Sequence, residues 1–75
     1  MAEEEIIIGG IYKHFKNKRL YKVKAMAKNS SDLSDMVVYE AQYENPEARF
    51  WVRPVAEFVQ EVYWEGKTMK RFEKI

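Results

Sequence analysis

The chain has no cysteine, only one histidine, and few glycines or prolines, with three and two respectively. Without cysteine, neither a disulfide framework nor a thiolate metal site can hold the fold together. The apolar run Ile6-Ile7-Ile8 is short and follows an acidic start, which predicts neither a secretory signal nor a membrane span. We therefore expect a cytoplasmic protein that does not contact a membrane.

The composition that remains is typical of a globular protein, with 47% hydrophobic, 33% charged and 15% aromatic residues in a chain of 75. A chain of this length forms one domain and buries only roughly 60% of the surface that its unfolded form exposes. Aromatic side chains must therefore supply much of a small core. We predict an acidic tail at residues 1–8, in which Ile6–Ile8 is a candidate edge strand, and a single small β-barrel domain at residues 9–75.

The fold is organised around residues 50–62, where an apolar strand meets Pro54. Proline fixes its own φ and has no backbone N–H, so the strand that begins near Phe50 must end at about Arg53. Apolar residues then recur at helical spacing for a few positions before a β-branched and aromatic stretch resumes. The sequence therefore predicts one short helical turn after Pro54, followed by another strand.

Alternation of apolar and polar residues predicts the remaining strands. The polar stretch at residues 16–18 favours a hairpin loop in which Asn17 takes the left-handed conformation. In the strand that follows, Val23, Ala25 and Ala27 would share one face. The predicted strands cover residues 11–15, 20–27, 36–43, 48–53, 60–65 and 68–72. We therefore expect a mainly β protein that forms a small curled barrel of five or six short antiparallel strands.

Charge is segregated along the chain although the net charge is only +1. Residues 10–28 hold seven basic and no acidic side chains, whereas residues 29–65 hold eight acidic and two basic ones. Two interpretations are open: opposite charges that pair across a sheet, or a basic face that binds single-stranded nucleic acid. The residues of the second interpretation are Lys13, Lys16, Lys18, Arg19, Lys22 and Lys24.

Several short motifs, taken together, resemble one protein family. They are Gly10-x-Tyr12-x-His14-Phe15-Lys16, Tyr21-x-Val23, Ala27-x-Asn29-Ser30, Val37-Val38-Tyr39, Trp51-Val52-Arg53-Pro54 with Phe58, and Gly66 with Arg71-Phe72. In these residues, from about residue 9 to its end, the chain resembles the small bacterial proteins grouped as domain of unknown function 1653. The resemblance implies a small SH3-like β-barrel and no established activity. Members of that family tend to carry histidine, serine and glutamate where this chain has Asn29-Ser30-Ser31-Asp32, so a role that needs a second histidine does not transfer.

The candidate site combines the one histidine with an arginine beside a tryptophan. Trp51 and Arg53 are two residues apart on a predicted strand and project to the same face, where the indole could support the guanidinium. Structural alternatives are an imidazole bonded to a backbone carbonyl or to Tyr39, and an arginine paired with a glutamate over a core tryptophan. Arg71 is expected near the same rim. The candidate ligand-binding residues are His14, Tyr39, Trp51, Arg53 and Arg71.

An aromatic shelf next to a strand arginine, without a spaced nucleophile and base, predicts a noncatalytic binding module for a peptide, a protein or a small anionic ligand. The alternative is single-stranded nucleic-acid binding by the basic hairpin at residues 13–28. A third interpretation is a small hydrolase or nucleotide-modifying enzyme that uses His14 and Asp32. No acidic spacing indicates a metal loop, and we predict no metal and no cofactor. The oligomeric state stays open, because Ile6–Ile8 could pair at a sheet edge.

Overall fold

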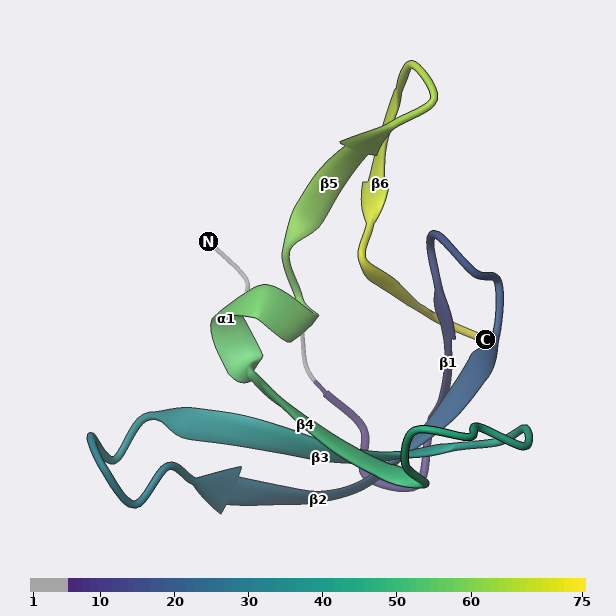
Figure 1. The fold of residues 1–75 in the computed structure, drawn as a ribbon. Helices are drawn as coiled ribbons and strands as arrows, with labels where there is room; N and C mark the ends of the chain where they lie inside the picture. Colours follow the sequence, from purple (N-terminus) through teal and green to yellow (C-terminus); the bar gives the residue numbers. More distant parts are fainter. Residues whose placement is uncertain (1–5) are drawn as a thin grey trace.

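Residues 6–75, which the computed structural model describes, form seven antiparallel strands and one helical turn (Figure 1). Five strands form a curled sheet in the order β4-β3-β2-β1-β7, and the remaining two pair only with each other as the hairpin β5-β6. The predicted mainly β fold is therefore confirmed. The elements are β1 (Ile11–His14), β2 (Leu20–Lys28), β3 (Asp35–Ala41), β4 (Phe50–Pro54), α1 (Val55–Phe58), β5 (Glu61–Trp64), β6 (Lys67–Lys70) and β7 (Phe72–Lys74).

The expected count of five or six strands was wrong because the last predicted strand divides at Arg71. Its backbone N–H donates to the carbonyl of Gln60, and its own carbonyl accepts from the N–H of Phe15. The chain therefore leaves the partner of β5 and becomes the partner of β1 within one residue. No strand pairing in residues 6–75 joins β4 to β7, so this sheet is curled but open rather than a closed barrel.

The core lies on the concave face of this sheet and is mostly aromatic. Phe58 of α1 is 1% exposed, and its ring stacks on that of Phe72 with 4.3 Å between centroids. Figure 1 shows α1 lying beside the curled sheet, directly after β4. The helical turn expected after Pro54 is thus confirmed, and it delivers the largest fully buried side chain. The core comprises Tyr12, Tyr21, Val23, Val37, Tyr39, Ala41, Phe58 and Phe72.

A β-bulge interrupts the register between β2 and β3. Val23 pairs with Tyr39, but Ala25 pairs with Val38, so one residue of β2 has no partner. Since directly opposite residues share a face, Met26 rather than Ala25 lies opposite the buried Val37. The prediction that the alanines of β2 continue the face of Val23 was therefore wrong, because an extra residue reverses the alternation beyond it.

The turns also differ from the prediction in detail. Lys18, with φ 60°, adopts the left-handed conformation expected of Asn17. Asn17 instead uses its side-chain oxygen to accept a hydrogen bond of 2.8 Å from the backbone N–H of Arg19. Between β5 and β6, Glu65 and Gly66 both have positive φ, as a two-residue type I′ hairpin turn requires.

The predictions for residues 1–8 can be compared with the structure only at residues 6–8. Ile6–Ile8 form no strand in the part of the chain that the structure describes, and the carbonyl of Ile7 instead accepts from Gly10 in a turn. Residues 1–5 of the acidic tail predicted at residues 1–8 lie outside the described residues. Among residues 6–75, no helix is long and apolar enough to cross a bilayer.

Candidate functional site

A pocket of about 230 Å³ opens beside the aromatic core, between the β1–β2 hairpin and β4. Four of the five predicted ligand-binding residues line it: His14, Tyr39, Trp51 and Arg53. The strands bring them together because His14 of β1 pairs with Phe72 of β7, while Tyr39 of β3 pairs with Trp51 of β4. The other lining residues, which sequence reasoning did not assign, are Asn17, Tyr21, Tyr43, Asn45 and Phe72.

His14 is held as a neutral ring. Its Nδ1 accepts a hydrogen bond of 3.2 Å from the backbone N–H of Lys16, so the neutral imidazole carries its proton on Nε2. Burial lowers the pKa of His14 from 6.5 to about 4, and the charges of Arg53, Arg71 and Lys16 act in the same direction. The expected bonds to a backbone carbonyl or to Tyr39 are replaced by this acceptor role. At neutral pH, His14 therefore offers the pocket an N–H donor and no charge.

Hydroxyl and amide groups line the opposite side of the pocket. The hydroxyl oxygens of Tyr21 and Tyr43 lie 2.6 Å apart, and Asn45 donates its side-chain N–H to the Tyr43 hydroxyl at 2.9 Å. Asn17 donates similarly to the Tyr21 hydroxyl at 3.3 Å. Burial, with the hydrogen bond to Tyr43, raises the pKa of Tyr21 to about 12. The Tyr21 hydroxyl therefore stays protonated, and the two hydroxyls position one another.

Arg53 provides the positive charge of the pocket. Its Nη1 lies 3.3 Å from a carboxylate oxygen of Glu57, one helical turn along the chain, and its Nε lies 3.5 Å from the Tyr39 hydroxyl. The ring beneath its guanidinium is Phe72, at 5.8 Å from the centroid. Trp51 lines the same pocket, but its indole N–H donates to the carbonyl of Ala48 at 3.0 Å. The expected glutamate partner is therefore present, and the expected indole support is replaced by Phe72.

Arg71, the fifth predicted residue, does not line this pocket. Its Nε donates to the carbonyl of Glu57 at 3.1 Å, and its Nη2 donates to the side-chain oxygen of Gln60 at 2.9 Å. Its guanidinium lies 6.0 Å from the ring centroid of Phe15. Arg71 therefore ties the β6–β7 bend to the helical turn, and it influences the pocket through its charge on His14.

The geometry for catalysis by His14 and Asp32 is missing from the pocket. Asp32 lies in the loop between β2 and β3, where it accepts from the backbone N–H of Ser34 at 2.9 Å, a bond that lowers the pKa of its carboxyl. Of residues 6–75, no acid and no serine line the pocket of His14. The described part of the chain also contains no group of three histidine, aspartate or glutamate side chains placed to hold a metal ion.

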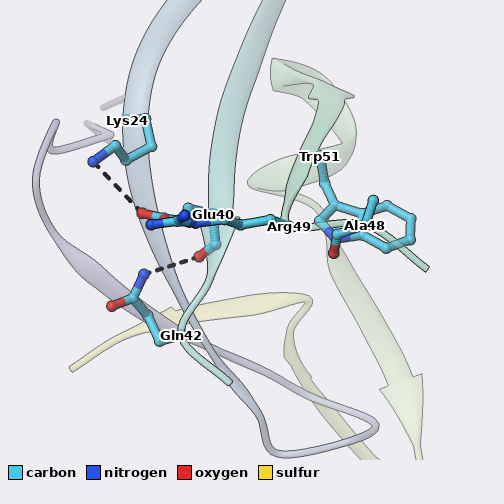
Figure 2. A network of polar contacts seen from close by, with 6 residues as sticks. All are labelled: Lys24, Glu40, Gln42, Ala48, Arg49 and Trp51. Atoms are coloured by element: carbon cyan, nitrogen blue, oxygen red, sulfur yellow. Dashed lines mark hydrogen bonds and ion pairs between the residues drawn. The ribbon is translucent and has the colours of Figure 1, made fainter. Parts of the chain in front are cut away.

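The buried carboxylate of Glu40 pairs with Lys24, one of the lysines predicted to bind nucleic acid (Figure 2). Only 7% of Glu40 is exposed; its carboxylate pairs with Arg49 and lies 3.5 Å from the ammonium of Lys24. The hydrogen bond from Arg49 lowers the pKa of the Glu40 carboxyl. Lys22 is the direct cross-strand neighbour of Glu40. Opposite charges therefore do meet across this part of the sheet, as the first charge interpretation expects.

The other four cations of the predicted nucleic-acid set lie nearer the hairpin loop. The Lys16 ammonium is 5.7 Å from the ring centroid of Trp64, and the Arg19 guanidinium is 4.9 Å from that of Tyr43. Lys13 and Lys18 line a separate groove on the β1–β7 side of the molecule. The six cations therefore lie in different environments: beside Glu40, over aromatic rings, or in the groove.

Comparison with known proteins identifies the family. Residues 10–74 match the family model described as protein of unknown function, DUF1653. The chain belongs to the DUF1653 family. A crystal structure of a DUF1653 protein from Bordetella bronchiseptica has a similar fold, with a TM-score of 0.83 at 20% sequence identity, over 92% of this chain and 87% of that one. None of the curated proteins compared with this DUF1653 chain matches it.

Proposed function

We propose that this DUF1653 protein is a noncatalytic binding module whose pocket receives a carboxylate, either of a small anionic ligand or of an acidic group on a peptide. One observation carries the proposal: a guanidinium, a neutral imidazole and tyrosine hydroxyls line one pocket together. All of these groups can donate hydrogen bonds to an anion, whereas no acid among residues 6–75 lines the pocket to repel it.

Arg53 is the residue that we expect to bind the carboxylate. Its side chain is 28% exposed, and in the described part of the chain its Nη2 has no acceptor. A planar guanidinium is suited to bidentate recognition of a carboxylate. The partner Glu57 is 53% exposed, and exchanging one such surface carboxylate for another has a small cost.

The size of the pocket and its aromatic walls limit the ligand. A volume of about 230 Å³ is below that of a typical drug-sized site, so it accommodates one side chain or a small acid. Trp51, Tyr39 and Phe72 present ring surface to the part of the ligand that follows the carboxylate. An SH3-like use of a curled sheet, in which a peptide lies across aromatic residues, fits this arrangement and stays a prediction.

Tryptophan fluorescence tests the proposal because Trp51 lines the pocket. In a Trp64→Phe background, the emission of Trp51 should change on titration with small dicarboxylates or with peptides that end in a free carboxylate. The amidated form of the same peptide should give a smaller change. Arg53→Gln should weaken binding about tenfold, and Arg53→Lys should restore only part of it. Lys28→Gln, which changes charge at an exposed pair with Asp35, is the control.

The proposal fails if free-carboxylate and amidated peptides shift the amide resonances of the pocket equally, or if Lys28→Gln reduces affinity as much as Arg53→Gln. The nucleic-acid interpretation of the whole hairpin receives less support, because Lys24 forms an ion pair with Glu40.

A further inference from the structure

A larger groove, of about 460 Å³, lies on the face of the sheet opposite the pocket. Successive residues of a strand point to opposite faces, so Tyr12 and His14 of β1 face the core side while Lys13 faces the groove. Lys13 pairs across the sheet with Glu73 of β7, as His14 pairs with Phe72. Lys13 and Glu73 of the groove therefore alternate with His14 and Phe72 of the pocket along the same two strands, while Lys74, the partner of Tyr12, lines the groove as well.

The groove concentrates positive charge well beyond that of the whole chain. Four lysines and one acid, Glu73, line it, which gives a formal charge of +3 for the groove against +1 for the full sequence. Two of the lysines come from the first hairpin and two from the last strands. The four lining lysines are Lys13, Lys18, Lys70 and Lys74.

Apolar surface completes the groove. Phe15 and Met69, both half-buried, line it together with the lysines. The ring of Phe15 is fixed by an edge contact with Trp64, 5.5 Å between centroids, and by the guanidinium of Arg71. An aromatic ring between cations is the arrangement on which single-stranded nucleic acids stack a base while the phosphates lie along the lysines.

We propose that this groove binds the phosphodiester backbone of a single-stranded nucleic acid, with one base against Phe15 and Met69. A single strand suits it better than a duplex, because only an unpaired base can reach an apolar surface inside a groove. The binding is independent of the carboxylate pocket and shares only Lys13 and Lys18 with the predicted basic hairpin set. Lys24, which pairs with Glu40, takes no part, whereas Lys74 of β7 does.

The test is fluorescence anisotropy of a labelled oligothymidylate over a salt series from about 50 to 200 mM. Lys13→Gln and Lys74→Gln should each weaken binding roughly fivefold at the low-salt end and flatten the dependence on salt, each by roughly 0.7 in the logarithmic slope. Lys24→Gln is the matched control, because it also removes one lysine of the predicted hairpin set. It should leave the affinity within about twofold, as expected for a lysine that contacts no phosphate.

Two further variants separate the groove from a general effect of charge. Lys18 has φ 60°, a conformation that asparagine tolerates better than lysine, so Lys18→Asn removes a cation without harming the turn and should still weaken binding. Glu73→Gln removes the one acid of the groove and should strengthen binding about twofold, because the acid repels phosphate. Far-UV circular dichroism of each variant checks that the sheet is intact.

Several outcomes overturn the proposal. Equal losses of affinity for Lys24→Gln and Lys13→Gln would show that binding depends on net charge and not on the groove. Tighter binding of a duplex, or of vesicles rich in anionic lipid, would assign the groove to another partner. If AMP competes as strongly as the unlabelled oligonucleotide, the groove binds a single nucleotide and not a nucleic-acid strand. Because the emission of Trp64 in a Trp51→Phe background reports on Phe15, failure here is distinguishable from failure of the pocket, which Trp51 reports.

Discussion

The two faces of the β1–β7 ladder differ in chemistry although they use neighbouring residues. His14 and Phe72 help to line a small pocket of rings, hydroxyls and one guanidinium, whereas Lys13 and Glu73, one position away in each strand, line a lysine groove. On the pocket side, charge is sparse and hydrogen-bond donors are positioned by one another. On the groove side, charge is dense. One strand can thus serve two sites because its side chains alternate with a period of two.

The largest effect on stability should come from a substitution in the aromatic core, against which the β1–β7 ladder packs. Phe58→Ala removes a ring that is 1% exposed and that contacts Tyr12, Tyr39 and Phe72. We expect a loss of about 3–5 kcal/mol in the free energy of unfolding, measured by urea denaturation. Phe50→Ala, at a residue 54% exposed, is the control and should cost less than about 1 kcal/mol. Similar losses for the two variants would contradict the assigned core.

Crossing the variants and the ligands tests whether the two faces act separately. Arg53→Gln should weaken carboxylate binding about tenfold and leave oligonucleotide affinity unchanged, whereas Lys13→Gln should do the reverse. Titrations of both variants with both ligands, at one salt concentration, measure the four values. If either variant affects both ligands to the same extent, the faces are coupled and the comparison does not hold.

The free energy of unfolding should depend on pH between about 6.5 and 4, because the pKa of His14 in the pocket differs between the unfolded and the folded chain. The groove has no histidine among its lining residues and should not contribute in this range. The folded pKa of about 4 lies below the ordinary 6.5, so the unfolded chain binds more protons in this window and stability falls as pH is lowered through it. Since water reaches the pocket and screens the charges, we expect a loss of about 1 kcal/mol. His14→Gln should lack this component in denaturation curves recorded at pH 7 and pH 4.5.

The smallest effect should come from the Glu40 network, which neutralises part of the basic hairpin. Arg49 and Lys24 hold the pKa of Glu40 below its ordinary value of 4.5, so the stabilisation is complete above that value and is lost as pH falls through the lower folded pKa. Glu40→Gln should lower the thermal midpoint slightly at pH 7 and not at strongly acidic pH. In addition, it releases Lys24, so oligonucleotide affinity should rise slightly. An unchanged midpoint at pH 7 would show that the pairs are fully screened.

Local patterns predicted much of the sheet and four of the nine residues that line the pocket. Alternation identified the main strands, and Pro54 identified the helical turn that buries Phe58. His14, Tyr39, Trp51 and Arg53 were found because aromatic rings and a strand arginine at a spacing of two mark one face. Tyr21 could also have been assigned to the pocket. It pairs with Ala41 of β3, and Ala41 shares a strand face with Tyr39 and Tyr43, which lie two residues to either side of it.

The remaining features depend on contacts that no local pattern contains. The bulge after Val23 reverses the faces of β2 beyond it, yet the residues there keep a regular alternation. The division at Arg71 depends on hydrogen bonds to Gln60 and Phe15, far away in the sequence. The groove lysines of β6 and β7 therefore could not be joined to Lys13 before the pairing of β7 with β1 was known.

The pairing of β7 with β1 also has a consequence for synthesis on the ribosome. The two strands lie almost the whole length of the chain apart, and a domain of this size completes its fold only when such distant partners can meet. Until Phe72–Lys74 leave the exit tunnel, the nascent chain lacks one wall of each concavity. Both binding activities should therefore appear together, once Phe72–Lys74 have left the tunnel, and shielding of the emerging β1 edge by a chaperone would delay them equally.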